Sequence, residues 1–107
     1  MNLITREELK ETIDRGDKFK LIMVLGDWQY RAKHIPGSIN ISSPEDPKVK
    51  ELSKDDEIVV YCSNVHCAAS MYAYQVLENA GFKVQRYAGG ILDWEEAGYP
   101  LEGEWAN

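Results

Sequence analysis

Long apolar runs and positive charge are both scarce in this sequence. No apolar run approaches the roughly 20 residues needed to cross a bilayer. The first residues also lack the basic segment and long apolar segment of a secretory signal peptide. We therefore expect a cytoplasmic protein with no membrane partner. The 12 Lys and Arg residues stand against 18 Asp and Glu residues, which gives a net charge of −6. Nucleic-acid binding needs a clustered basic surface, so we expect no nucleic-acid partner.

Cysteine is scarce as well, because the 107 residues include only two thiols, Cys62 and Cys67. In an acidic cytoplasmic domain, such a pair more often indicates redox chemistry, a metal site or no chemistry than a structural disulfide. His66 lies between the two cysteines, and His34 lies earlier in the chain. Their spacing fits no common zinc pattern, so we expect neither a metal nor another cofactor.

Strand-like and helix-like segments alternate along the whole chain. The segments with strand character are residues 19–25, the end of 34–41, 58–61 and 82–87. The segments with helix character are residues 5–16, 28–32, 47–52, 68–80 and 91–97. This alternation predicts one α/β domain over residues 1–107, with a parallel sheet and helices on both faces.

Capping residues indicate where several helices begin and end. Thr5 with Glu8 three residues later forms a capping box, and Gly16 is a stop signal for the same helix. Asp46 followed by Pro47 predicts the start of a second, short helix. These signals place each helix between two strands, as a parallel sheet requires.

The segment from Ile58 to Tyr61 is the clearest strand, because it is apolar and contains three β-branched residues in a row. Cys62 follows it directly and faces the start of the helix over 68–80. There, the backbone N–H groups of residues 63–69 can surround the sulfur and stabilise its thiolate, the form that attacks sulfur. We hypothesise that Cys62 is a nucleophile with a pKa below that of a free thiol. A buried structural cysteine is the alternative.

Several motifs occur in an order that resembles a known family. They are His34-Ile35-Pro36-Gly37-Ser38-Ile39-Asn40, Val59-Val60-Tyr61-Cys62, Gly81-Phe82, Tyr87-Ala88-Gly89-Gly90-Ile91-Leu92-Asp93-Trp94 and Ala97-Gly98-Tyr99-Pro100. Together they resemble a single-domain rhodanese, also called a rhodanese-like sulfurtransferase. The resemblance implies an α/β fold with a five-stranded parallel sheet, and a sulfane sulfur carried as a persulfide on Cys62. It also places the Gly89-Gly90 turn near the active loop.

The resemblance implies that sulfur is exchanged with small-molecule or protein donors and acceptors. The loop that would bind the substrate or its anion consists of Ser63, Asn64, Val65, His66, Cys67, Ala68 and Ala69. Since this loop carries no Lys or Arg, the anion must be held by backbone N–H groups.

The loop departs from the pattern of the family. Val65 stands where the family usually has Gly, and Cys67 stands where it usually has Arg. No Lys or Arg occurs between Cys62 and Phe82. Thiosulfate is a dianion that a bidentate Arg would hold, so we expect it to be a poor donor. Ala68 also excludes the Cys-x5-Arg motif of cysteine phosphatases.

Three hypotheses about function follow. The first is a sulfurtransferase that uses Cys62 and a less charged donor, such as a persulfide or a polysulfide. The second is a non-catalytic interaction module with the rhodanese fold. The third is a dithiol redox protein in which Cys67 resolves a persulfide or sulfenic acid on Cys62; alternatively, Cys67 only fills the start of the helix.

Overall fold

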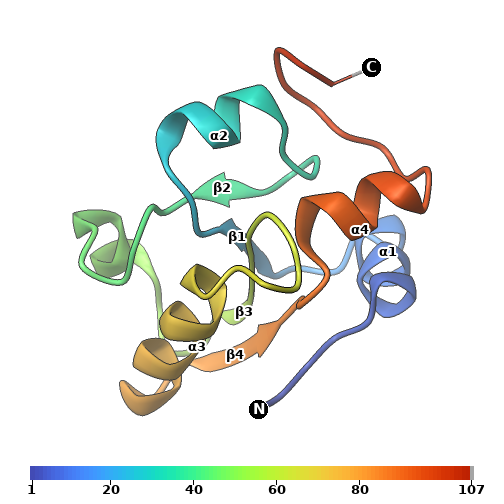
Figure 1. Ribbon diagram of the computed structural model, residues 1–107. Helices are drawn as coiled ribbons and strands as arrows, with labels where there is room; N and C mark the ends of the chain where they lie inside the picture. Colours follow the sequence, from blue (N-terminus) through green and yellow to red (C-terminus); the bar gives the residue numbers. More distant parts are fainter. Residues whose placement is uncertain (107) are drawn as a thin grey trace.

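A four-stranded parallel sheet with the strand order β2-β1-β3-β4 forms the centre of the fold (Figure 1). The structure is a computed structural model, which describes residues 1–106. Its strands are β1 (Lys20–Met23), β2 (Ile39–Asn40), β3 (Glu57–Tyr61) and β4 (Lys83–Arg86). All three strand pairs are parallel. The parallel sheet predicted from the alternation of segments is therefore confirmed.

The expected fifth strand is reduced to a single bridge. Leu3 pairs in parallel with Arg86 at the outer edge of β4. The backbone N–H of Ile4 donates to the Arg86 carbonyl at 3.1 Å, and the N–H of Arg86 donates to the Asn2 carbonyl at 2.9 Å. Thr5 begins a helix immediately afterwards. The prediction of five strands was wrong in this detail because the chain leaves the sheet edge before a strand can extend.

The helices follow the predicted order with small changes at their ends. They are α1 (Arg6–Asp14), α2 (Asp27–Ala32), the 3-10 helix η1 (Pro47–Glu51), α3 (Ala69–Asn79) and α4 (Gly90–Glu96). The predicted capping box is present: the Glu8 N–H donates to the Thr5 hydroxyl at 3.1 Å, and the Thr5 N–H donates to the Glu8 carboxylate at 3.0 Å. None of the helices found in residues 1–106 is long and apolar enough to cross a membrane.

Each face of the sheet packs against its own set of helices. On one face, Leu21 and Tyr61 belong to a core cluster with Leu9 of α1 and Trp94 of α4. The alternate residues of the same strands point to the other face, as the pleat requires. There they form a second cluster with α3 and η1: Ile22, Val60, Val84, Ala73, Leu77, Val49 and Leu52. This second face lies beneath the helix that begins just after Cys62.

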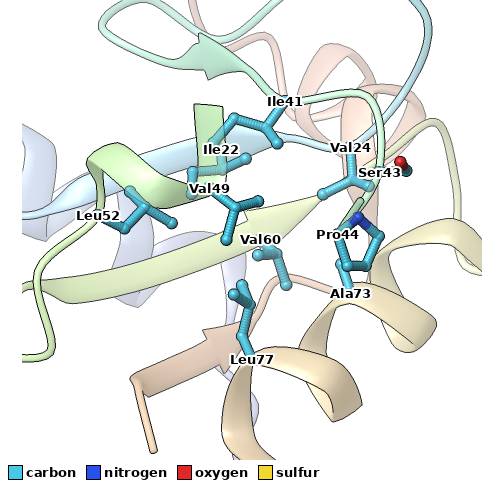
Figure 2. A pocket seen from close by; sticks show the side chains of 10 residues that line it. All are labelled: Ile22, Val24, Ile41, Ser43, Pro44, Val49, Leu52, Val60, Ala73 and Leu77. Carbon is cyan, nitrogen blue, oxygen red and sulfur yellow. The ribbon is translucent and has the colours of Figure 1, made fainter. Parts of the chain in front are cut away.

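Figure 2 shows the seam where η1 and α3 meet the sheet. The side chains around it are Ile22, Val24, Ile41, Ser43, Pro44, Val49, Leu52, Val60, Ala73 and Leu77. The space between them is about 10 Å³, close to the minimum for one water molecule, and its lining is almost wholly apolar. The seam is therefore part of the core packing and offers no room for a substrate.

We expect Leu77→Ala to lower the free energy of unfolding by about 2–5 kcal/mol, because it would leave a cavity beneath α3. Urea unfolding monitored by circular dichroism would measure the change. Met71→Ala is the matched control, since Met71 is an exposed apolar residue on the same helix. The control should change stability by less than about 0.5 kcal/mol. Equal losses in the two variants would contradict this packing.

Candidate active site

Cys62 lies directly after β3, beside the first turn of α3. Its side chain is only 1% exposed. The sulfur lies 3.2 Å from the Ser70 hydroxyl and 3.6 Å from the Cys67 carbonyl, both within hydrogen-bond reach of the thiol. The predicted position of Cys62, between the end of a strand and the start of a helix, is therefore the one observed. Its sulfur faces the interior and depends on protein groups for its hydrogen bonds.

The segment after Cys62 forms a compact turn around Asn64. The Asn64 side-chain oxygen accepts a hydrogen bond from the His66 N–H at 2.8 Å. The Asn64 backbone carbonyl accepts one from the Cys67 N–H at 3.1 Å. Such side-chain-to-backbone bonds are the reason that Asn is favoured in tight turns. The turn brings Cys67 back toward Cys62, so the two thiols of the chain lie next to each other.

The N-terminus of α3 has no side-chain cap. Ala68 occupies the cap position and supplies no hydrogen-bond acceptor. The first amides of a helix carry partial positive charge, and the Cys62 sulfur lies beside this turn, 3.2 Å from the Ser70 hydroxyl. The Ser70 backbone contributes a hydrogen bond that favours the Cys62 thiolate, while the backbones of Ala69 and Ser63 do the same for Cys67. Backbone groups of this segment therefore favour the thiolates of both cysteines.

The two thiols have opposite pKa shifts. Burial raises the pKa of Cys62, and its hydrogen bond to Cys67 acts in the same direction, against the hydrogen bonds from Ser70. Burial acts to raise the pKa of Cys67 as well, yet that pKa is lowered, because the hydrogen bond from Cys62 and the backbone bonds from Ala69 and Ser63 stabilise its thiolate. The hypothesis of a low pKa for Cys62 is wrong for the resting protein, since Cys62 is the more deeply buried thiol.

The amino end of α4 holds the active loop from the other side. The N–H groups of Ile91 and Leu92 donate to the carbonyls of Cys62 and Ser63 at 3.0 and 2.9 Å. Gly90, the first residue of α4, has a φ of +69°. A Cβ atom at this position would lie 2.5 Å from the Cys62 carbonyl oxygen. The predicted glycine turn beside the active loop therefore depends on Gly90.

A shallow cavity lies between the loop and α4. It is lined by Asn64, Val65, His66, Gly89, Leu92, Asp93 and Glu96, and its volume is about 440 Å³. Two carboxylates line it, and among the described residues no Lys or Arg does so. Asp93 is paired with Arg6 at 3.1 Å, so a dianion such as thiosulfate would meet the like charge of Glu96 in particular, whereas a neutral or cationic group would not.

The residues considered for a metal do not come together. His66 is exposed on the active loop. The His34 ring instead stacks on Tyr30 with a centroid distance of 4.0 Å, and its Nδ1 lies 2.8 Å from the Tyr30 carbonyl. Nowhere in residues 1–106 do three His, Cys, Asp or Glu side chains gather as a metal site would require.

Arg86 is the residue near Cys62 that the sequence reasoning missed. It ends β4, and its Nε donates to the Ser70 hydroxyl at 3.0 Å. Ser70 therefore contacts both Arg86 and Cys62. The pattern did contain a signal: Arg86 is two residues after buried Val84 in an alternating strand, a place where an apolar residue is expected.

Comparison with known proteins connects this site to a family. The family model of the rhodanese-like domain matches residues 5–97. HTH-type transcriptional regulator Rv0324 of Mycobacterium tuberculosis is 37% identical over 100 residues, which cover 92% of this chain and 44% of that protein. Putative sulfurtransferase YtwF of Bacillus subtilis is 32% identical over 93 residues, 86% of this chain and 88% of that one. The solved structure of BH2092 protein from Bacillus halodurans has a TM-score of 0.90 at 26% identity, over 98% and 79% of the chains. The resemblance stated from the motifs is confirmed.

We expect Gly90→Ala to disturb the active loop, because its Cβ would collide with the backbone of Cys62 and Ser63. Gly98→Ala is the matched control, since Gly98 has a φ of +76° and a Cβ added there would have no other atom within 4 Å. The control should lose about 1–2 kcal/mol from backbone strain alone. Gly90→Ala should lose about 3 kcal/mol or more and should also change the alkylation rate of Cys62. Urea unfolding and iodoacetamide labelling measure both, and equal effects in the two variants would refute the collision.

Proposed function

The chain belongs to the family of rhodanese-like domains, and we propose that it is a sulfurtransferase that carries sulfane sulfur as a persulfide on Cys62. The observation that carries this proposal is the place of Cys62: its sulfur lies at the carboxyl edge of the sheet, 3.2 Å from the Ser70 hydroxyl in the first turn of α3, whose hydroxyl and backbone N–H can donate to an anionic sulfur. Those donors suit an anionic sulfur. The family-level match to a sulfurtransferase supports the same chemistry.

The transfer proceeds through two displacements at sulfur. The Cys62 thiolate attacks the outer sulfur of a donor persulfide, the bond between the donor's two sulfurs breaks, and the donor leaves as a thiolate. Cys62 then carries the outer sulfur as a persulfide. In the second displacement, a nucleophilic acceptor attacks that sulfur and regenerates the Cys62 thiolate. No electrons are gained or lost overall, so neither step requires an external oxidant.

Cys67 provides an acceptor for the proton of Cys62. Its pKa is lowered against the effect of burial, in part by the hydrogen bond from Cys62, so Cys67 is the more acidic thiol of the pair. Cys62 must lose its proton to become nucleophilic. We propose that the proton passes to Cys67 as the Cys62 sulfur attacks, so the raised pKa of the buried thiol does not prevent reaction at neutral pH.

The charges around the loop indicate a donor with little negative charge. Asp93 and Glu96 line the cavity beside the loop, and the loop itself has no Lys or Arg. A thiosulfate dianion would approach against these carboxylates. We therefore propose that the donor is a persulfide or polysulfide, presented by a small molecule or by a protein.

Incubation with a sulfane-sulfur donor and measurement of the intact mass would test the proposal. We expect a gain of one sulfur atom with glutathione persulfide or polysulfide, and much less gain with thiosulfate. Cys62→Ser should gain none, while the matched control Cys67→Ser should still gain sulfur, more slowly. Sulfur retained in Cys62→Ser would assign the persulfide to Cys67 and overturn the proposal.

A non-catalytic interaction module is the alternative function if no donor transfers sulfur to Cys62. One relative is named as a transcriptional regulator, so a region similar to this chain also occurs in a protein whose name does not describe sulfur transfer. Failure of glutathione persulfide, polysulfide and thiosulfate alike, with a protein that unfolds cooperatively, would favour that alternative.

The contact between the two thiols supports a second reaction of the same site. Cys67 accepts a hydrogen bond from Cys62 in the resting pair. Once Cys62 carries a persulfide and Cys67 has given up its proton to the departing donor thiolate or to solvent, the Cys67 thiolate can attack the inner sulfur, the Cys62 Sγ. A Cys62–Cys67 disulfide then forms and hydrosulfide leaves. In this reaction Cys67 is the resolving thiol, and the disulfide must be reduced by an external dithiol before the next cycle.

We expect persulfidated wild-type protein, left without an acceptor, to release hydrosulfide and then to have the mass of the reduced protein less two hydrogens. Cys67→Ser should hold its persulfide several times longer, because it has no resolving thiol. Intact mass and a methylene blue assay for hydrosulfide would follow both products. Equal persulfide lifetimes in the two proteins would show that Cys67 does not resolve Cys62.

A further inference from the structure

Arg86 places a positive charge inside the protein on the same side of the sheet as Cys62. The register of β3 with β4 pairs Arg86 with Val60, and both Val60 and Val84 belong to the core cluster beneath α3. Side chains two residues apart in a strand share a face, so Arg86 and Cys62 both lie toward α3. The Arg86 side chain is only 5% exposed.

Ser70 joins the two side chains in a continuous buried row. Its hydroxyl oxygen lies 3.0 Å from the Arg86 Nε, which donates to it, and 3.2 Å from the Cys62 sulfur. Ser70 is 1% exposed, so water does not compete for these contacts. A hydroxyl can accept from a guanidinium and donate to an anion at the same time.

The Arg86 guanidinium lacks a carboxylate partner. Within the described part of the chain, none of the ion pairs includes Arg86. Its Nη2 is buried and makes no hydrogen bond. A guanidinium stays protonated in proteins, and a buried charge without a counter-ion is unfavourable. One negative charge close to Ser70 would therefore balance the charge of the Arg86 guanidinium.

Few other ionisable groups approach this row. From the loop, Cys67 faces Cys62. On α3, Tyr74 lies one turn beyond Ser70, but its hydroxyl donates to Glu78. From α4, only backbone N–H groups reach the Cys62 carbonyl. Cys62 is the thiol whose sulfur contacts Ser70, so a negative charge formed on Cys62 lies at the Ser70 end of the row.

We infer that Arg86 is the counter-ion of the anionic forms of Cys62, and that Ser70 transmits its charge. With a neutral thiol, the Ser70 hydroxyl oxygen accepts from both neighbours. When Cys62 loses its proton, the Ser70 hydroxyl turns to donate to the sulfur while it still accepts from Arg86. For the persulfide form, this inference rests on the function proposed above. Arg86 is a positioning residue, since it acts on the sulfur through Ser70.

The inference also refines the choice of donor. One cation inside the protein balances the single negative charge of a thiolate or a persulfide. The carboxylates of Asp93 and Glu96 lie on the outer side of the loop, where a second negative charge of a donor would remain. A sulfane sulfur that arrives with one charge or none therefore fits this site, whereas a dianion would leave one charge without a partner.

The test is a titration of Cys62 in the absence of any sulfur donor. In the full chain carrying Cys67→Ser, the alkylation rate of Cys62 by iodoacetamide is measured against pH, with peptide mapping by mass spectrometry. Addition of Arg86→Met should raise the apparent pKa of Cys62 by about one unit or more, so that labelling near pH 7 slows about tenfold. Arg86→Lys retains the charge and should restore most of the rate.

Arg31→Met is the matched control, because it removes an exposed arginine and changes the net charge equally. It should leave the pKa of Cys62 unchanged. A shift in Arg86→Met no larger than in Arg31→Met would overturn the inference, whatever happens to thermal stability. If Arg86→Met does not fold, Ser70→Ala provides the test, because it keeps the charge of Arg86 but removes the hydroxyl that connects Arg86 to Cys62. An unchanged pKa of Cys62 in Ser70→Ala would also overturn the inference.

The outcomes separate this inference from the proposed function. The titration needs no persulfide, so a protein that never accepts sulfur can still show the Arg86 dependence. Conversely, sulfur gained on Cys62 together with an unchanged pKa in Arg86→Met would support the sulfurtransferase and refute the role of Arg86.

Discussion

The burial of the Cys62 sulfur is the constraint on which the rest of the site depends. A sulfur almost fully removed from water cannot ionise unless the protein supplies hydrogen bonds and charge. Each neighbouring element contributes to that need. The first turn of α3 offers uncapped amides and the Ser70 hydroxyl, the loop returns Cys67 to the sulfur, and α4 anchors the Cys62 carbonyl. Gly90 is required because no side-chain atom fits where α4 approaches that backbone.

The parallel sheet fixes these positions through its register and its pleat. Val60 pairs with Arg86, so Arg86 at the end of β4 and Cys62 directly after β3 both lie on the face under α3. Tyr61 points to the opposite face, where its hydroxyl accepts from the Ile35 N–H at 3.0 Å and lies 2.9 Å from the Ser38 hydroxyl. Burial raises the pKa of Tyr61, so it remains a neutral hydrogen-bonding group there. The motif around Pro36 thus holds the end of β3 in place.

The charged groups around the site lie on two sides, a cation in the interior and carboxylates at the surface. Inside, Arg86 is a cation without a carboxylate partner among residues 1–106, and Cys62 is the group beside Ser70 that can become an anion. Outside, Asp93 and Glu96 line the approach to the loop. An exposed loop arginine would attract dianions from solution, whereas a buried one stabilises charge only after the sulfur has entered. This separation connects the loop composition with the weakly charged sulfur donor that we propose.

The sequence by itself determined the parallel α/β architecture, the capping box at Thr5 and the place of Cys62 at the end of a strand. These follow from periodicity and from contacts between residues close in the chain, which local patterns record. Only the tertiary structure decided that the fifth strand is a single bridge, that the pKa of Cys62 is raised while that of Cys67 is lowered, and that Arg86 reaches Ser70. Each of these depends on desolvation or on contacts between elements far apart in the chain. The loop in the sequence lacks a cation, and the fold brings one to its buried side from the neighbouring strand.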